Sequence, residues 1–454
     1  MDNYRSKVLT FVSISIILLF TASYFNKNIV AFYPNFKGIN IVSDIIEKPI
    51  KKNKTSVPKK LNQATASDPI YHDFEQYDAI ENCIMGFDQY KDEVVLSDFQ
   101  NKILALSQQK KGKIRIAWFG DSTIEGDLIT KQLRVLFNNY FKSDTGVGFL
   151  PIHTVASEFR KTGTIDLNGT FETNNFIENP KNLFISGYSY NASDLELTVT
   201  NKVKKNPSIN LEKWLYCGKG DSLEIEMDDK IRLFTPTLNF NKILLDNSPS
   251  NVINFKIKKN NAPIFGVSME PETGIIIDNY SFRGITGVEL RKVQNQLLDE
   301  LNSDATYDLI VFQYGVNLLY KPDLVDFENY HSKMNHVIKR LKKHLNKSEF
   351  LIIGSADRAF QYNGEWKTAV GMDSLLKVQA KIAYENKIPF FNLYKSMGGE
   401  GTIVKWVDSL PTMANKDYIH FNYKGANKVA NIIFNSFIND YNKILKNKSR
   451  KSKK

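Results

Sequence analysis

Cysteine is scarce in this chain: Cys83 and Cys217 are the only two among 454 residues. Two thiols cannot form a disulfide framework, and neither has a CxxC partner or a histidine at zinc-ligand spacing. A disulfide-rich scaffold and a structural zinc domain are therefore excluded. The sequence offers no other cluster of metal ligands either, so we expect no metal and no other cofactor.

Acidic residues are absent from two basic segments, and this absence explains the net charge of +11. Residues 48–60 hold six lysines, and residues 443–454 hold seven basic residues. The rest of the chain is close to neutral. Because no RNP, helix-turn-helix or zinc-finger pattern accompanies the basic segments, we expect no nucleic-acid binding.

Charge is also missing from Val8 to Phe25, a run of eighteen residues that follows Arg5 and Lys7. This run is just long enough to cross a bilayer as a helix. The alternative is a cleaved signal peptide, but Thr21 to Ser23 offers only a poor cleavage site. We therefore expect an uncleaved anchor that holds the protein on a membrane, facing the periplasm or the cell exterior.

Hydrophobic residues make up 42% of the chain and aromatic residues 12%, which excludes disorder throughout. Apolar runs are followed by helical patterns in both halves of the chain. Repeated strand–helix pairs predict an α/β domain with a parallel sheet covered by helices on both faces. The expected strands are 113–119, 307–313, 349–355 and 388–393, and the expected helices are 98–109, 128–141, 327–345, 373–385 and 423–444.

Helical periodicity nearly disappears between about Thr162 and Ile277. Short alternating segments such as LELTVTN and DSLEIEM recur there between Asn, Gly, Pro and Asp clusters. This pattern predicts a β-sandwich inserted into the α/β domain. Its aromatic residues are expected in the core, and a sugar-stacking face is the alternative; the residues concerned are Tyr188, Tyr190, Trp214 and Tyr216.

Four short motifs stand at expected strand ends or before expected helices, and active sites of open α/β sheets gather at the carboxyl ends of strands. They are GDST (Gly120–Thr123), RGITG (Arg283–Gly287), GVN (Gly315–Asn317) and DYIH (Asp417–His420). Each alone has a simpler interpretation, because a serine often caps a helix and a histidine often lies on the surface. Their combination in this order favours a catalytic site.

These motifs resemble the blocks of the SGNH, or GDSL, hydrolase superfamily, from Asp98 to Ile444 without the insert. The longer runs AWFGDSTIEGDLIT, MGGEGTIVKW and DYIHFNYKG are similar to bacterial cell-surface members that act on O-acetyl esters of peptidoglycan or other glycans. Such peptidoglycan O-acetylesterases also carry an inserted, carbohydrate-binding-like β-domain. The chain departs from common family wording at Thr123 and in having GVN rather than GTN or GND.

The expected chemistry is nucleophilic catalysis by Ser122. A serine hydroxyl needs a base, and His420 suits that role at neutral pH. Asp417, three residues earlier, can hold the imidazole in the useful tautomer. The resemblance assigns the oxyanion hole to the N–H groups of Ser122 and Gly287 and to the side-chain amide of Asn317.

Other residues near these motifs have simpler expected roles. Gly284 is the alternative to Gly287 as the oxyanion glycine. Asp121 is expected to shape the turn that carries the serine. Glu125 and Asp127 are expected to complement the dipole of the following helix or to cap it.

On this basis we divide the chain into six parts. They are an N-terminal membrane anchor or signal (1–25), a flexible tether (26–90), the first part of an SGNH hydrolase domain (91–160), an inserted β-sandwich that is a candidate for carbohydrate binding (161–277), the second part of the hydrolase domain (278–445) and a basic tail (446–454).

The resulting functional hypothesis is an extracytoplasmic serine carbohydrate esterase that removes O-acetyl groups from a cell-wall or surface polysaccharide. Its partners would be an acetylated glycan substrate and, through the N-terminal helix, a membrane. One alternative is polysaccharide O-acetyl transfer at the same site, with a membrane acyltransferase as candidate partner. Another is a catalytically inactive wall-binding protein.

Overall fold

A computed structural model describes residues 83–87, 94–203 and 209–451 of the chain. All of the described residues belong to one compact unit of the chain. The expected membrane helix at Val8–Phe25 therefore lies outside the described residues. Within the described ranges, no helix has both the length and the apolar character that a bilayer crossing needs.

A five-stranded sheet forms the centre of the α/β part, with its strands in the order β13–β1–β14–β15–β18. All four pairings in it are parallel. The strands are β1 (Lys113–Gly120), β13 (Gly274–Ser281), β14 (Leu309–Gln313), β15 (Glu349–Ile353) and β18 (Phe390–Phe391). The expected parallel α/β architecture is confirmed.

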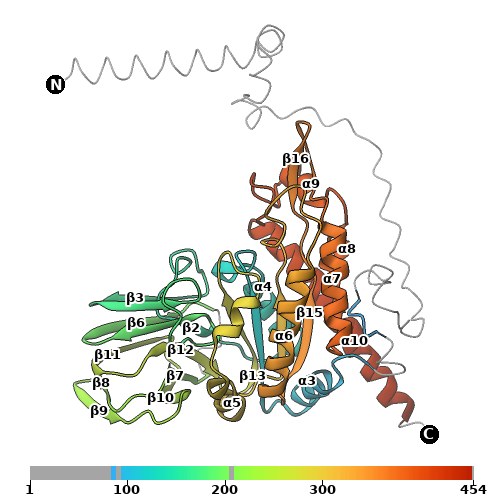
Figure 1. Cartoon of the computed structure of the whole chain (residues 1–454). Coiled ribbons are helices and arrows are strands. Elements are labelled where there is room, and N and C mark those ends of the chain that lie inside the picture. The colour runs from blue at the N-terminus through green and yellow to red at the C-terminus, as the bar shows by residue number, and fades with distance from the viewer. Residues whose placement is uncertain (1–82, 88–93, 204–208, 452–454) are drawn as a thin grey trace, which may run out of the picture. The chain divides into compact units, whose positions relative to one another are not determined.

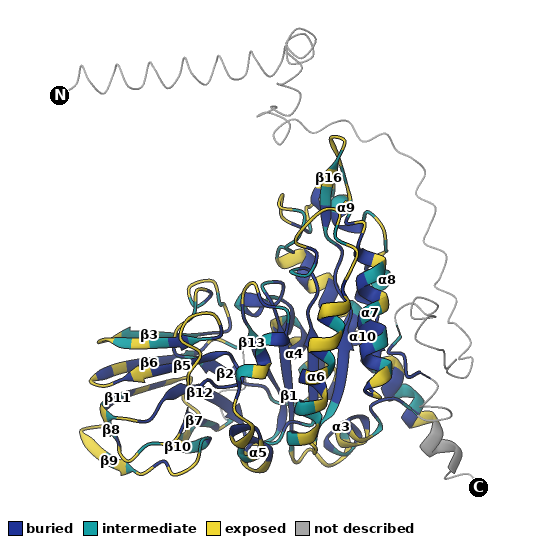
Figure 2. Cartoon of the chain, in the orientation of Figure 1, coloured by how far each residue is buried: buried dark blue, intermediate teal, exposed yellow. Residues whose placement is uncertain are grey.

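Helices cover both faces of this sheet, because alternate side chains of each strand point to opposite sides. Ile116 and Trp118 of β1 pack into one core, whereas Ala117 and Phe119 pack into the other. The first core is shared with α3 (Ser97–Gln109), α4 (Leu128–Phe141), α8 (Leu393–Met397), α9 (Thr402–Asp408) and α10 (Tyr423–Lys451), and the second with η5 (Val288–Lys292), α5 (Asn295–Asp304), α6 (Glu328–His344) and α7 (Met372–Glu385). Figure 2 shows the sheet buried between exposed helix surfaces.

Two antiparallel sheets occupy the chain between β1 and β13, which confirms an inserted β-domain (Figure 1). Alternation is clearest in β6, where Leu195, Leu197 and Val199 are fully buried. One sheet contains β2 (Gly148–Pro151), β4 (Phe171–Asn175), β5 (Tyr188–Ala192), β7 (Leu211–Cys217), β10 (Asn241–Ser248) and β12 (Ile264–Pro271). The other contains β3 (Gly163–Asn168), β6 (Leu195–Asn201), β8 (Leu223–Met227), β9 (Lys230–Phe234) and β11 (Val252–Asn260).

The structure corrects both expected edges of the insert. Strand β13 was expected to begin inside the insert, yet Gly274 to Ser281 pair in parallel with β1. Its short apolar run GIIID resembles the insert strands in sequence, but β13 is an edge strand of the parallel sheet and is buried from Gly274 to Tyr280. Conversely β2, expected in the hydrolase part, pairs antiparallel with β12.

The structure also corrects the ends of the tether and of the last helix. Residues 84–87, expected in the flexible tether, are buried, and Met85 exchanges backbone hydrogen bonds of 2.8 and 2.9 Å with Phe390 of β18. Helix α10 continues to Lys451 rather than ending at Ile444. Lysine and arginine favour helices, and their positive charge is favourable near a helix C-terminus.

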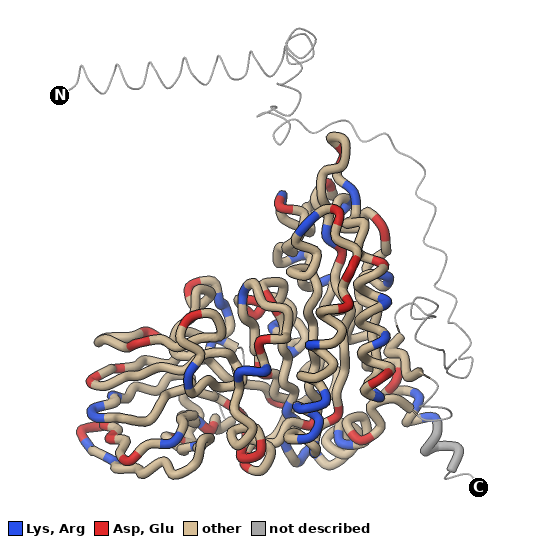
Figure 3. The backbone as a smooth tube through the Cα atoms, in the orientation of Figure 1, with Lys and Arg blue, Asp and Glu red and all other residues tan. Residues whose placement is uncertain are grey.

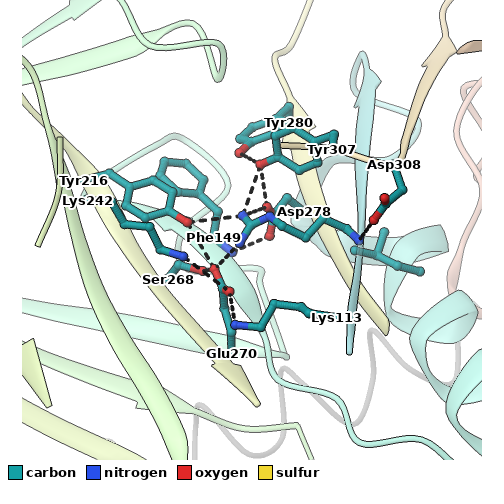
Figure 4. A network of polar contacts seen from close by, with 12 residues as sticks. Lys113, Phe149, Tyr216, Lys242, Ser268, Glu270, Asp278, Tyr280, Tyr307 and Asp308 are labelled. Carbon is teal, nitrogen blue, oxygen red and sulfur yellow. Dashed lines mark hydrogen bonds and ion pairs between the residues drawn. The ribbon is translucent and has the colours of Figure 1, made fainter. Parts of the chain in front are cut away.

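A buried polar network joins the parallel sheet to the inserted domain (Figure 4). The Arg115 guanidinium on β1 donates to Glu270 of β12 at 2.6 Å and to Asp278 of β13 at 2.9 Å. Lys113 donates to Glu270 at 2.9 Å, and the Tyr216 hydroxyl donates to the same carboxylate at 3.1 Å. Elsewhere basic and acidic positions are interspersed along the described chain (Figure 3). The two parts therefore meet across fixed, paired charges rather than a loose linker.

A short antiparallel hairpin rises beyond the sheet after β15, near the top of Figure 1. Its strands are β16 (Ala359–Tyr362) and β17 (Glu365–Thr368). The hairpin is fixed at its base by Asp357, which accepts hydrogen bonds from the Thr368 hydroxyl at 2.9 Å and from the Ile403 N–H at 2.8 Å.

Candidate active site

Ser122 lies directly after β1, between the ends of β1 and β14. The order of the parallel strands is 2-1-3-4-5 when they are counted along the chain, so this is where the winding reverses and where such folds bind ligands. Asp121 shapes the turn as expected, because its carboxylate accepts the Thr123 N–H at 2.9 Å and the Thr123 hydroxyl at 2.8 Å. Burial raises the pKa of Asp121.

The structure brings Ser122 together with His420 and Asp417, although 298 residues separate the serine from the histidine. Ser122 Oγ lies 2.8 Å from His420 Nε2, and His420 Nδ1 lies 2.8 Å from Asp417 Oδ2. The other oxygen of Asp417 accepts the backbone N–H groups of Ile419 at 2.9 Å and His420 at 3.0 Å. The three side chains form one continuous hydrogen-bonded chain.

Hydrogen bonds stabilise the negative charge of Asp417. Burial raises its pKa, but the hydrogen bonds from the His420 ring and from the two backbone N–H groups outweigh burial, and the pKa falls to about 2. The carboxylate is therefore ionised at neutral pH, where it can fix the Nδ1–H tautomer of His420. That tautomer leaves Nε2 free to accept the serine proton.

Asn317 lies at the end of β14 and is half-buried. Its amide nitrogen donates to the Ile285 carbonyl at 3.0 Å, which ties it to the RGITG loop. A side-chain amide has two N–H bonds, so one remains for a ligand.

The two candidate glycines of that loop differ in position. Gly287 is buried at φ +92°, and a Cβ there would lie 2.8 Å from the Tyr314 ring. Gly284, at φ +79°, is exposed and lines the cavity beside Ser122, whereas Gly287 is not part of the lining. The structure thus brings Asn317 and Gly284 to the cavity lining, whereas Gly287 is buried outside that lining.

A cavity of about 630 Å³ opens over Ser122 and His420. Its polar lining comes from Glu125, Arg283, Asn317, Asn415 and Asn422, and its apolar lining from Leu128, Ala156, Phe159, Phe421 and Tyr423. A mixed lining of this size can hold a small organic ligand with its reacting group against the serine. Among the described residues, no group of three or more His, Cys, Asp or Glu side chains could hold a metal ion.

Two carboxylates near the serine form ion pairs that were not expected. Glu125 lies in the helical turn before α4, is buried and receives the Arg283 guanidinium at 2.5 and 2.9 Å. Asp127 makes no side-chain cap and instead forms a buried ion pair with Arg134. The sequence predicted neither pair. Glu125 and Arg283 stand 158 residues apart in different motifs, and no motif joins Asp127 to Arg134.

The aromatic residues of the insert settle mainly into its core. Tyr188, Tyr190 and Tyr216 are buried, which confirms core packing for these three. Trp214 is half-buried, and the Lys242 ammonium lies 4.1 Å above its ring centre.

No protein-family model matches the chain, and no curated protein does. Among solved structures, the chain is similar to one named "Peptidoglycan O-acetylesterase in action, 5 min", with 18% identity, a TM-score of 0.65, and coverage of 76% of this chain and 96% of that one. A family two carbohydrate esterase from Cellvibrio japonicus (7% identity, TM-score 0.25, 62% and 99% covered) and an acetylxylan esterase from Geobacillus stearothermophilus (14%, 0.27, 37% and 74%) also match. These two likenesses are too distant to carry an argument. The fold that the motifs predicted is confirmed by the first: this chain has the fold of a peptidoglycan O-acetylesterase structure, inserted β-domain included.

Proposed function

We propose that this protein is a serine esterase that removes O-acetyl groups from a cell-wall or surface polysaccharide. The observation that carries the proposal is the unbroken hydrogen-bonded chain from Ser122 through His420 to Asp417 at the base of a cavity. The fold shared with a peptidoglycan O-acetylesterase structure supports an acetylated glycan as the substrate class. The apolar run Val8–Phe25 supports a membrane-anchored, extracytoplasmic protein.

In the proposed mechanism, Ser122 Oγ attacks the ester carbonyl carbon while His420 Nε2 takes the hydroxyl proton. Asp417 stabilises the imidazolium that forms. The negative charge on the carbonyl oxygen is met by the free N–H of the Asn317 amide and by backbone N–H groups of Ser122 and of a glycine in the RGITG loop.

Collapse of this intermediate breaks the bond to the sugar oxygen, which leaves with the proton from His420. An acetyl-serine remains. Water then attacks the acetyl carbonyl while His420 takes the water proton. As the bond to Ser122 Oγ breaks, His420 returns that proton to the serine oxygen and acetate leaves. The 2.8 Å contact between Ser122 Oγ and His420 Nε2 supports the proton transfers between serine and histidine, and the 2.8 Å contact between His420 Nδ1 and Asp417 Oδ2 orients the ring for them.

Hydrolysis of p-nitrophenyl acetate by the full-length, detergent-solubilised protein tests the proposal. Ser122→Ala and His420→Ala should lower kcat by on the order of 10⁴- to 10⁶-fold. The matched controls Ser303→Ala and His336→Ala change exposed residues and should retain wild-type rates. Equal rates for all five proteins would overturn the catalytic assignment.

A second experiment tests whether water or a sugar hydroxyl accepts the acetyl group. O-acetylated muropeptides are incubated with the protein, with and without an unacetylated glycan acceptor, and the products are separated by mass. Free acetate in both reactions supports the esterase. An acetylated acceptor would show that the protein is an O-acetyltransferase instead.

A further inference from the structure

The inserted domain reaches the cavity through one short segment. Residues 154–160 follow β2, and within them Ala156 and Phe159 line the same cavity as Ser122. The segment is ordered by its own hydrogen bonds, from the Thr154 N–H to the Ser157 hydroxyl at 2.8 Å and from the Phe159 N–H to the Ala156 carbonyl at 3.0 Å. These bonds hold the local conformation of the segment.

Phe159 is an unusual side chain for such a place, because 59% of it is exposed. A Cβ on Gly126 would lie 3.7 Å from the Phe159 Cβ, so the residue sits against the turn that follows Ser122. No described aromatic ring stacks on Phe159. An exposed apolar ring in the lining of a cavity is available for contact with a ligand.

A second exposed aromatic ring comes from the hydrolase part of the chain, just after the DYIH motif. Tyr423 is the first residue of α10, three residues after His420, and 49% of it is exposed. It lines the same cavity, and again no described ring stacks on it. One ring thus comes from the inserted domain and one from the hydrolase part, and both serve the same cavity.

Polar groups accompany the two rings. Asn415 is exposed and lines the cavity, and its side-chain amide has no hydrogen-bond partner among the described residues. Glu125 and Arg283 add a fixed ion pair to the lining. A pyranose ring presents apolar C–H faces and a rim of hydroxyls, so open aromatic rings together with a free amide match its chemistry.

We propose that Phe159 and Tyr423 form a sugar-binding subsite that holds the pyranose ring whose acetyl ester reaches Ser122, with Asn415 bonding its hydroxyls. This inference rests on the proposed esterase function and deepens it. The inserted domain then recognises substrate directly at the active site, through Phe159. Binding energy from the sugar ring positions the ester for attack.

The experiment compares two classes of acetyl ester on the full-length protein. Triacetin has no ring, whereas O-acetylated muropeptides and acetylated xylo-oligosaccharides present pyranose rings. Phe159→Ala should raise the KM for the better sugar ester about tenfold with little change in kcat, and should lower kcat/KM for triacetin by a clearly smaller factor. Phe159→Trp should restore the KM, because it restores a ring.

Val155→Ala is the matched control, because Val155 lies in the same segment with the same exposed fraction of 59% but does not line the cavity. Val155→Ala should leave the kinetic constants for both classes of ester at wild-type values. Tyr423→Phe should retain the sugar KM, and Tyr423→Ala should raise it.

Three results would overturn the subsite: an unchanged sugar KM in Phe159→Ala, an equal loss on triacetin and sugar ester, or a wild type that prefers triacetin to both sugar esters. Activity on triacetin that Ser122→Ala abolishes would still uphold the esterase in each case. Failure of the subsite and failure of the proposed function are thereby distinguished.

Discussion

Trp366 stacks on Tyr418, with ring centres 3.8 Å apart and an angle of 12° between the ring planes. Tyr418 stands between Asp417 and His420, and its backbone is left-handed at φ +59°. Its carbonyl also accepts the Ala359 N–H at 3.1 Å. The β16–β17 hairpin therefore contacts the loop that carries the proposed base, His420, and its partner Asp417.

Arg358 connects the same hairpin to the proposed oxyanion donor. Its guanidinium donates to the Val316 carbonyl at 2.7 Å, one residue before Asn317, and lies close enough to Asp417 for their charges to interact. One hairpin thus contacts both loops that meet at Ser122. We expect it to hold their relative position.

Removal of the indole tests this positioning role. In Trp366→Ala, the left-handed Tyr418 loses its stacking partner and can relax, which displaces His420 from Ser122. A shift of about 1 Å at a catalytic group costs on the order of 10²-fold, so kcat should fall by about ten- to a hundredfold with KM little changed. Steady-state kinetics on p-nitrophenyl acetate measure both constants.

Two companions separate positioning from a general loss of folding. Trp366→Phe should recover most of kcat, because a smaller ring still stacks, and Lys367→Ala, an exposed neighbour, should behave as wild type. A parallel rise in KM, or no recovery with phenylalanine, would contradict the positioning role.

Asp417→Asn should lower kcat by about 10⁴-fold, because an amide can stabilise the wrong tautomer of the imidazole. The pKa of Asp417 is about 2, so its ionised form persists as the pH falls and is lost only near that value. The carboxyl ¹³C chemical shift of Asp417 should therefore stay constant from neutrality down to pH about 4. A change in that shift within this range would show that the carboxylate titrates there.

Asn317→Ala removes one proposed oxyanion donor and should lower kcat by about 10²- to 10³-fold with a small effect on KM. Asn431→Ala, an exposed amide on α10, is the matched control. If instead KM rises and kcat holds, Asn317 binds the ground state and is not an oxyanion donor.

Local sequence patterns predicted the regular elements well. Helix α4 spans Leu128–Phe141 as expected, because its apolar period is continuous and a turn precedes it. The parallel strand β13 was assigned to the insert, since a short apolar run has the same appearance in either kind of sheet. Whether a strand joins a parallel or an antiparallel sheet depends on the strand it pairs with, and the sequence of one segment does not identify that partner.

The candidate site also contains features that the sequence predicted and features that it did not. The contact between Ser122 and His420 was expected from the family resemblance, which supplies long-range information that spacing lacks. The Glu125–Arg283 pair and the cavity position of Phe159 were not predicted. Glu125 and Arg283 stand in different motifs, Phe159 stands in none, and the fold alone brings them together.

The buried network at the junction of the two parts gives the last prediction. Burial raises the pKa of Glu270, but Arg115, Lys242 and Lys113 outweigh burial and hold it well below the usual 4.5. Glu270→Gln leaves those cations with less compensation, and breaking a buried pair costs about 3–5 kcal/mol of unfolding free energy. Glu226→Gln, which loses a half-exposed pair with Lys258, should cost less than about 1 kcal/mol.

The pH dependence of the Glu270 effect has a definite sign. A carboxylate whose pKa is lower in the folded state stabilises the protein above its unfolded-state pKa, and that contribution is lost as the pH falls towards the folded-state value. The difference in stability between wild type and Glu270→Gln should therefore be full at neutral pH and shrink below about 4.5. Urea unfolding followed by tryptophan fluorescence at several pH values measures it. A difference that grows on acidification, or one no larger than that of Glu226→Gln, would show that the network does not hold the inserted domain to the sheet.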